Sequence, residues 1–269
     1  MVVFIHVDTK SLAFLRMHGF VSQPLKTGHE ITRLEGMGVS CVLYASGKLL
    51  IQGKQDAVAK VSTLFLKQGF TQDAPVFELE KETGWVIGSD ETLKGDTFGG
   101  IVVAAVKADA AARTKLLEMG VNDSKKLRDE EMVPLARKIK EVAACEVRSI
   151  LPEEYNAHTN QTLLLNRLHK ECAVALGSGT HIVDKFPGCL VGDVIEEKAD
   201  SRYLEVAAAS IIARVAGLEQ LRFISGRAGF IVPKGSTHVH EALEMVRKKG
   251  LDPTTLVKMN FRNVKDVFE

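Results

Sequence analysis

With 269 residues, the chain can bury a sizeable core, and its length lies between one large domain and two ordinary ones, so we expect two domains. A hydrophobic content of 45%, a charged content of 26% and a net charge of +1 are typical of a globular protein, and the longest apolar runs are too short to span a membrane. The four cysteines lack Cys-x-x-Cys spacing, which argues against a disulfide framework and a zinc knuckle and indicates reduced thiols in a cytoplasmic protein.

Residues 1–70 are predicted to form a small α/β domain. The stretch CVLYASGKLLIQGK at 41–54 alternates apolar and polar residues on both sides of a Ser-Gly pair, which indicates a hairpin. The following QDAVAKVSTLFLKQGF at 55–70 has apolar residues on one helical face. This part holds 8 Lys and Arg against 4 Asp and Glu, a balance that suits contact with phosphates. Residues 71–83 combine a proline with acidic residues and no regular period, so they are the predicted linker.

Residues 84–269 are predicted to form the larger domain, in which strands come first and helices increasingly alternate with them. The predicted strands are GWVIGSDE, GGIVVAAVKAD, CEVRSIL, HIVDKF and LVGDVIEE. The predicted helices are RDEEMVPLARKIKEVAA, NQTLLLNRLHKECAVAL, the stretch from Leu204 to Leu218, and THVHEALEMVRKKG. This order of elements predicts a mixed sheet covered by helices.

Acidic residues recur in the larger domain at the ends of apolar strands or just before a helix. Asp90 and Glu91 follow WVIGS, Asp184 ends HIVD, and Asp200 precedes the long helix. A single Asp in such a place is more often a turn former or a helix cap. If the strands are neighbours, however, the carboxylates converge and raise one another's pKa values unless a cation neutralises them. Oxygen ligands without matching His or Cys select Mg²⁺ or Mn²⁺, and two such ions about 4 Å apart suit phosphoryl transfer.

The stretch GSDETLKGDTFGG at 88–100 resembles the signature of type 3 ribonuclease H, ribonuclease HIII. Further blocks match this family in the same order: VNDSKKL, PEEYNAHTNQTLLLNRLH, VDKF, KADSRYLEVAAASIIAR, VPKGSTHVHEAL and KMNFRN. The resemblance covers nearly all of residues 84–263. It implies the ribonuclease H fold, with a mixed five-stranded sheet covered by helices, and a small N-terminal TATA-binding-protein-like α/β domain at 1–70 that holds the substrate.

The resemblance also implies an activity. The expected enzyme is a metal-dependent endoribonuclease that hydrolyses the RNA strand of RNA/DNA hybrids, leaves 5′-phosphate and 3′-hydroxyl ends, and acts as a monomer. The implied ligands of two Mg²⁺ or Mn²⁺ ions are Asp90, Glu91, Asp184 and Asp200, with Asp90 bridging; the family often has Glu in place of Asp200. Two other interpretations stay open: a type 2-like ribonuclease H that cuts at single embedded ribonucleotides, and a catalytically weak hybrid-binding protein.

A ribonuclease H must detect the 2′-hydroxyl of RNA, and backbone groups of a glycine-rich loop suit this contact. In the resembling family a Gly-x-Gly element makes it, but here the element reads Leu93-Lys94-Gly95, so the first glycine is absent. We expect Leu93→Gly to alter substrate preference or affinity more than stability. Lys94 is predicted to reach a phosphate, and the other predicted contacts to sugar or phosphate are Gly95, Ser124, Lys125, Lys126, Asn156 and Lys234, although each lysine also fits an ordinary solvated surface. Asn160 is predicted to cap the following helix.

Overall fold

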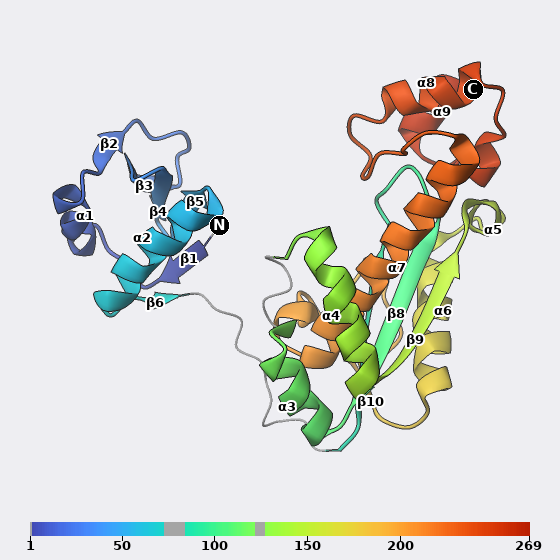
Figure 1. Cartoon of the computed structure of the whole chain (residues 1–269), viewed down its shortest axis with the longest axis horizontal. Helices are drawn as coiled ribbons and strands as arrows, with labels where there is room; N and C mark the ends of the chain where they lie inside the picture. The colour runs from blue at the N-terminus through green and yellow to red at the C-terminus, as the bar shows by residue number, and fades with distance from the viewer. Residues whose placement is uncertain (1, 73–83, 122–126) are drawn as a thin grey trace. The chain divides into compact units, whose positions relative to one another are not determined.

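The computed structural model describes residues 2–72, 84–121 and 127–269 of the chain (Figure 1). The chain divides into two compact units, Met1–Pro75 and Val76–Glu269, which we call the N-terminal and the C-terminal unit. Each unit has hydrophobic clusters of its own. Within the described ranges, no helix is long and apolar enough to cross a membrane.

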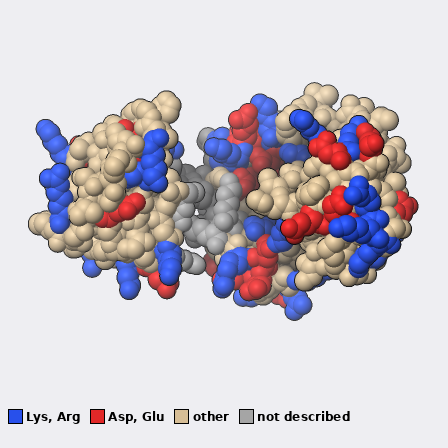
Figure 2. Space-filling view, turned by 90° about the horizontal axis from the view of Figure 1, so that it is seen from above, with Lys and Arg blue, Asp and Glu red and all other residues tan. Residues whose placement is uncertain are grey.

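The N-terminal unit is built on a six-stranded antiparallel sheet in the order β2-β3-β4-β5-β1-β6. The predicted hairpin is present as the pair β4 and β5, and the predicted helix is α2, which buries Val58, Val61 and Phe65. Basic side chains stand around this unit, at the left of Figure 2, and outnumber the acidic ones in that view. The elements of the unit are β1 (Val2–Ile5), α1 (Ala13–Met17), β2 (Val21–Gln23), β3 (Glu30–Gly36), β4 (Val39–Tyr44), β5 (Leu49–Gly53), α2 (Gln55–Lys67) and β6 (Thr71–Gln72).

The first two residues of the predicted linker belong to this sheet. Thr71 and Gln72 form β6 and pair with Ile5 and Phe4 of β1. The pairing satisfies backbone groups that would otherwise be exposed at the edge of β1. The rest of the predicted linker, residues 73–83, lies outside the described residues.

A mixed five-stranded sheet forms the centre of the C-terminal unit, as predicted, in the order β11-β10-β7-β8-β9. Strands β7, β8 and β9 are antiparallel neighbours, whereas β10 runs parallel to both β7 and β11. The last strand is shorter than predicted because Gly192 takes a φ of 110°, which an extended strand does not allow. The strands are β7 (Val86–Thr92), β8 (Ile101–Ala108), β9 (Ala144–Ile150), β10 (Thr180–Asp184) and β11 (Val194–Glu196).

Helices cover both faces of this sheet (Figure 1). Helix α7 lies along one face with α3 and α4 beside it, and α6 covers the other face. Along β8, Ala104 and Val106 pack toward α7, while Val103 and Ala105 pack toward α6. The helices are α3 (Ala110–Glu118), α4 (Asp129–Val142), α5 (Pro152–Asn156), α6 (Gln161–Leu176), α7 (Leu204–Ala228), α8 (His240–Lys248) and α9 (Arg262–Phe268), with short 3-10 turns η3 (Ala199–Ser201) and η4 (Pro253–Thr255).

Helix α7 approaches β7 more closely than any side chain at Gly88 would allow. A Cβ atom on Gly88 would lie 2.2 Å from the backbone nitrogen of Val206 and 2.3 Å from the carbonyl carbon of Glu205. Both of these atoms belong to the first turn of α7, which follows η3 directly. The contact therefore fixes where η3, with Asp200, lies relative to the strand that carries Asp90.

A separate hydrophobic cluster joins the end of α7 to α8 and α9, which pack together at one end of the unit (Figure 1). The cluster also takes in Leu93 and Phe98 from the connection between β7 and β8. Phe98 forms an isolated bridge with Val257. The C-terminal part of the chain thus supports the β7–β8 connection.

Candidate active site

The four predicted metal ligands lie on three elements that meet at one end of the sheet. Asp90 and Glu91 lie in the last part of β7, at the end of the predicted strand GWVIGSDE, and β7 continues one residue further to Thr92. Strand β10 pairs with β7 in parallel, in a register that puts Asp184 beside Asp90. Because parallel neighbours end at the same edge of a sheet, these carboxylates are adjacent.

Asp200 joins this edge through the turn η3. The backbone N–H of Ala199 donates a hydrogen bond of 2.9 Å to Oδ1 of Asp184, which ties the turn to the end of β10. Ser201 donates to Oδ1 of Asp200 at 3.3 Å. The short turn before α7, which carries Asp200, is therefore anchored at the edge of the sheet where Asp90 and Asp184 lie.

Asp90 is buried, with 8% of its surface exposed. Its Oδ1 accepts a hydrogen bond of 2.8 Å from the backbone N–H of Glu91. Burial raises the pKa of Asp90 to about 8, and the charges of Glu91 and Asp184 act in the same direction, while a hydrogen bond from Ser210 opposes them. The folded chain alone thus disfavours the ionised form of this carboxyl.

Glu91 has different partners. Its Oε1 is 2.5 Å from Nζ of Lys94, and its Oε2 is 3.3 Å from Nε2 of His169. Burial alone would raise the pKa of Glu91, but His169 and Lys94 together outweigh it, so the pKa lies below its usual value. Lys94, predicted to reach a phosphate, thus lies against Glu91, because the buried carboxylate attracts the nearest ammonium.

Ser89, His169 and His181 form a buried polar cluster next to Glu91. Oγ of Ser89 lies 2.8 Å from Nδ1 of His169 and 2.8 Å from Nε2 of His181. Nε2 of His169 and Oε2 of Glu91 face each other, although neither atom has a hydrogen-bond partner among the described residues. Burial lowers the pKa of His181 to about 4, which keeps that imidazole neutral. Sequence reasoning missed this cluster, since the two histidines have no paired spacing; Ser89, next to Asp90, was its one local signal.

The residues fit a divalent cation in type, and β7, β10 and η3 bring their backbones to one edge of the sheet. Carboxylate oxygens are the donors that Mg²⁺ and Mn²⁺ prefer. A cation would offset the repulsion that raises the pKa of Asp90, and Oε2 of Glu91 is buried without a hydrogen bond among the described residues. In the same described ranges, no three His, Cys, Asp or Glu side chains lie close enough together to hold an ion. The carboxylates must therefore turn toward one another to bind one.

Leu93, predicted to contact substrate, has a buried side chain. It is 6% exposed and packs in the C-terminal cluster, close to Gly99 and Gly217. Its φ is 62°, in the left-handed region that favours glycine. Packing of the side chain compensates for this backbone conformation, so only the backbone of Leu93 remains for a substrate. Gly95 is exposed, and a Cβ built on it would meet nothing within 4 Å.

This burial argues against our expectation that Leu93→Gly spares stability. We now expect the change to lower the free energy of unfolding by about 2–3 kcal/mol, because the cavity it leaves costs more than the about 1 kcal/mol gained by relieving the left-handed backbone. Denaturant unfolding of the C-terminal unit measures this. Leu221→Ala in the same cluster is the control for a cavity without a backbone effect. A loss below about 0.5 kcal/mol would contradict the prediction.

The remaining predicted substrate residues lie elsewhere or are engaged within the chain. The Asn156 amide donates to two carbonyls, of Thr254 and Val257, and accepts from the N–H of Met259, each at 2.9 Å. A substrate contact by this side chain would break these bonds, so Asn156 is an architectural residue. Lys234 is ion-paired with Asp129 of α4. The predictions outside the described residues are Ser124, Lys125 and Lys126.

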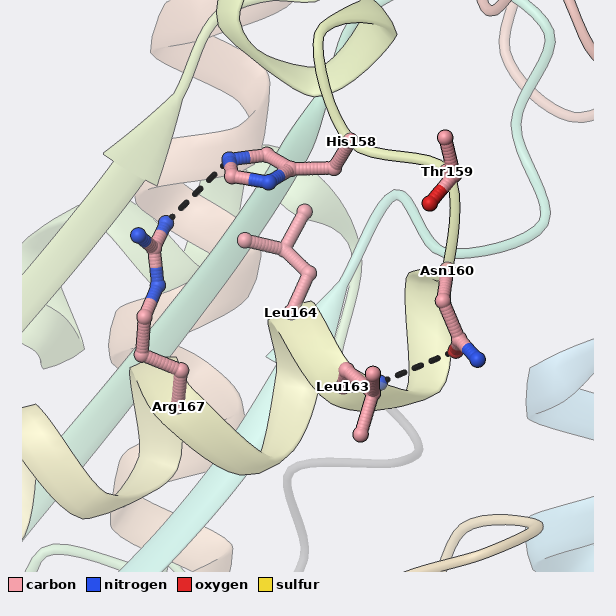
Figure 3. Close-up of a pocket in the computed structure, with 6 residues that line it drawn as sticks. All are labelled: His158, Thr159, Asn160, Leu163, Leu164 and Arg167. Atoms are coloured by element: carbon pink, nitrogen blue, oxygen red, sulfur yellow. Dashed lines mark hydrogen bonds between the residues drawn. The ribbon is translucent and has the colours of Figure 1, made fainter.

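A pocket of about 170 Å³ opens at the start of α6 (Figure 3). Asn160 caps the helix there, as predicted, and accepts a hydrogen bond of 3.1 Å from the N–H of Leu163. Nη2 of Arg167 lies 3.3 Å from Nε2 of His158 across the pocket. The lining contains none of the four carboxylates, so this pocket is not the predicted metal site.

The chain is similar to known ribonucleases of types 2 and 3. A family model described as ribonuclease HII matches residues 87–185 and 179–264. Ribonuclease HIII of Geobacillus kaustophilus is 31% identical, over 98% of this chain and 97% of the relative. The solved structure of Bst-RNase HIII in complex with Mn²⁺ is similar with a TM-score of 0.64 and 29% identity, over 98% of this chain and 97% of that one. The Archaeoglobus fulgidus ribonuclease HII, solved in complex with PCNA, has a TM-score of 0.59 and 28% identity, over 66% of this chain and 96% of that one.

Proposed function

The chain belongs to the ribonuclease HIII family, and on that premise we propose that it hydrolyses the RNA strand of RNA/DNA hybrids endonucleolytically, leaving 5′-phosphate and 3′-hydroxyl ends. The predicted ribonuclease H fold is confirmed, since the solved ribonuclease HIII structure is similar along nearly the whole chain. The observation that carries the proposal is the meeting of β7, β10 and η3, which brings four carboxylates to one edge of the sheet. We further propose that the enzyme acts as a cytoplasmic monomer.

The residues proposed to hold two divalent ions are Asp90, as the bridging ligand, Glu91, Asp184 and Asp200. Bound ions of this kind supply charge neutralisation, an activated water and stabilisation of the leaving oxygen. The chain's own part is to keep Glu91 ionised through His169 and Lys94 and to hold Asp90 and Asp184 side by side. The solved Bst-RNase HIII complex with Mn²⁺ supports the choice of a divalent ion.

Two substrates and a chelator separate this function from its alternatives. We expect the purified protein to cut a continuous RNA/DNA hybrid with Mg²⁺ or Mn²⁺, to stop in EDTA, and to leave a duplex with one embedded ribonucleotide intact. Cleavage of both duplexes would favour a type 2-like enzyme. Metal-independent binding without cleavage would favour a hybrid-binding protein. The match of the ribonuclease HIII relative to nearly the whole chain, against two thirds for ribonuclease HII, supports the type 3 assignment.

We also propose that the N-terminal unit binds the hybrid through its basic side chains, which outnumber the acids 8 to 4 in residues 1–70. Removing residues 1–83 is expected to weaken hybrid binding about tenfold or more and to flatten its dependence on salt, because each lost phosphate contact removes about one unit of the salt slope. Titrations at several salt concentrations measure both. Equal affinity and slope for the two chains would refute a binding role for this unit.

A further inference from the structure

Lys258 is a fully buried lysine that reaches the connection between β7 and β8. Its side chain has 0% exposure, and its Nζ donates hydrogen bonds to the carbonyl oxygens of Leu93, at 2.8 Å, and Asp96, at 2.6 Å. The same nitrogen lies 5.4 Å from the ring centroid of Tyr155 and 5.3 Å from that of Phe261. Two carbonyl dipoles and two aromatic faces thus take the place of water around the ammonium.

Burying a lysine here costs more free energy than burying an apolar side chain of similar size. Burial lowers the pKa of Lys258 to about 7, although the charge of Asp96 opposes the shift. A methionine of similar size would fill the volume without removing an ammonium from water. The lysine therefore does more than fill volume. Its two hydrogen bonds fix the backbone of the loop Leu93–Asp96.

A second side chain holds the same loop. Nε2 of Gln161 donates to the carbonyl oxygen of Lys94 at 3.2 Å, and its Oε1 accepts from the hydroxyl of Tyr155 at 3.1 Å. Three of the four loop carbonyls thus bond to the body of the unit. The backbone N–H groups of Lys94 and Gly95 have no hydrogen-bond partner among the residues that the structure describes. The loop therefore bonds three of its carbonyl oxygens to the body of the unit, while the N–H groups of Lys94 and Gly95 stay without a partner in the described part of the chain.

We propose that Lys258 is a positioning residue for hybrid recognition: by holding the carbonyls of Leu93 and Asp96 inward, it leaves the N–H groups of Lys94 and Gly95 to the sugar-phosphate backbone of the hybrid. This inference rests on the proposed function. Leu93 makes these hydrogen bonds necessary, because its left-handed backbone costs a residue other than glycine about 1–2 kcal/mol. Without the lysine, the loop is expected to relax toward other conformations, in which the N–H groups of Lys94 and Gly95 no longer keep a fixed position.

The test compares Lys258→Met with the wild-type chain and with Leu243→Ala, a cavity variant in the neighbouring cluster that leaves the loop hydrogen bonds intact. With divalent ions, Lys258→Met is expected to raise KM for hybrid about tenfold with kcat within about threefold. Without divalent ions, when nothing is cut, amide hydrogen exchange of residues 93–96 is expected to slow on adding hybrid in the wild type and in Leu243→Ala but not in Lys258→Met. Gln161→Ala is expected to show the same pattern more weakly, which keeps the test decisive if Lys258→Met fails to fold.

Two results would overturn the positioning role. One is a Lys258→Met or Gln161→Ala loop that hybrid protects as fully as in the wild type. The other is a parallel change of KM and kcat in Lys258→Met and Leu243→Ala, which a merely structural role would give. Loss of the proposed function has a different signature, since a wild-type chain that does not cut hybrid would refute the activity. Absence of loop protection in the wild type would refute the positioning role alone.

Discussion

Asp90→Asn is expected to lower kcat for hybrid cleavage by about 1,000-fold, equivalent to about 4 kcal/mol of activation free energy, while the protein stays folded. The amide keeps the shape of the side chain but replaces a charged oxygen at the point where β7 and β10 meet. If two ions bind as proposed, Asp90 would hold both of them while Glu91 and Asp184 would each hold one, so neither would replace Asp90. Single-turnover cleavage with saturating Mn²⁺ measures the loss.

The matched control is Glu118→Gln, which removes one negative charge at an exposed position of α3. It is expected to cleave at the wild-type rate. Asp90→Asn should also bind hybrid as tightly as the wild type, because Asp90 is buried and its proposed role is to hold the ions rather than the nucleic acid. Mg²⁺-dependent cleavage by Asp90→Asn within about tenfold of the wild type would overturn its assignment as the bridging ligand.

The same variant has a second expected effect, on stability without metal ions. The folded-state pKa of Asp90 is about 8, above its ordinary value of 3.8, so the folded state binds this proton more tightly than the unfolded state. The resulting stability is fully present below about pH 4 and is lost as the pH rises through about 8. Asp90→Asn removes this dependence. In EDTA, its melting temperature should exceed that of the wild type by more at about pH 9 than at about pH 5.

Gly88→Ala is expected to destabilise the C-terminal unit by about 3 kcal/mol or more, or to prevent its folding. The added methyl group would lie 2.2 Å from the nitrogen of Val206 and 2.3 Å from the carbonyl carbon of Glu205. These are backbone atoms of a helix, so no rotamer change relieves the clash. The helix must move away from β7, which would also carry η3 and Asp200 away from Asp90 and lower kcat in any protein that folds.

Gly226→Ala is the control on the same helix. A Cβ atom on Gly226 meets nothing within 4 Å, so this change is expected to leave stability unchanged or to raise it by about 0.5–1 kcal/mol, as alanine does in place of glycine inside a helix. Urea unfolding of both variants measures the difference. If Gly88→Ala cost no more than Gly226→Ala, the close approach of α7 to β7 would not be the feature that places Asp200.

The sequence was most informative where hydrophobic periodicity is strong. The buried run of β8 and the amphipathic α4 were predicted close to their observed bounds, and the start of α7 at Leu204 was predicted as well, although the helix continues past the predicted Leu218 to Ala228. Helix α3 was missed because its alanine-rich AAARTKLLE has almost no amphipathic pattern, and the structure buries Ala112, Arg113 and Leu116 through tertiary contacts. Strand β11 was predicted too long because the backbone of Gly192 could not be known from its neighbours.

For the site, the sequence predicted that the carboxylates are adjacent, but it did not predict the contacts of the surrounding polar side chains. The positions of Asp90 and Asp184 at the ends of predicted strands indicated that they would be neighbours, because parallel adjacent strands end at the same edge of a sheet. Nothing in the local sequence indicated that Lys94 pairs with Glu91, that Asn156 is used by the C-terminal segment, or that Lys258 is buried. Each depends on residues that lie far apart in the chain or on burial, and polar residue types usually predict exposure.

The supports of the loop Leu93–Asp96 come late in the chain. Lys258 donates to two of its carbonyls, and Asn263 donates to Oγ1 of Thr97 at 2.8 Å. During synthesis, Leu93 and Thr97 leave the ribosome 165 and 166 residues before their partners Lys258 and Asn263, respectively. The connection between β7 and β8 therefore reaches its final conformation only when the C-terminal segment has been synthesised and has packed against it.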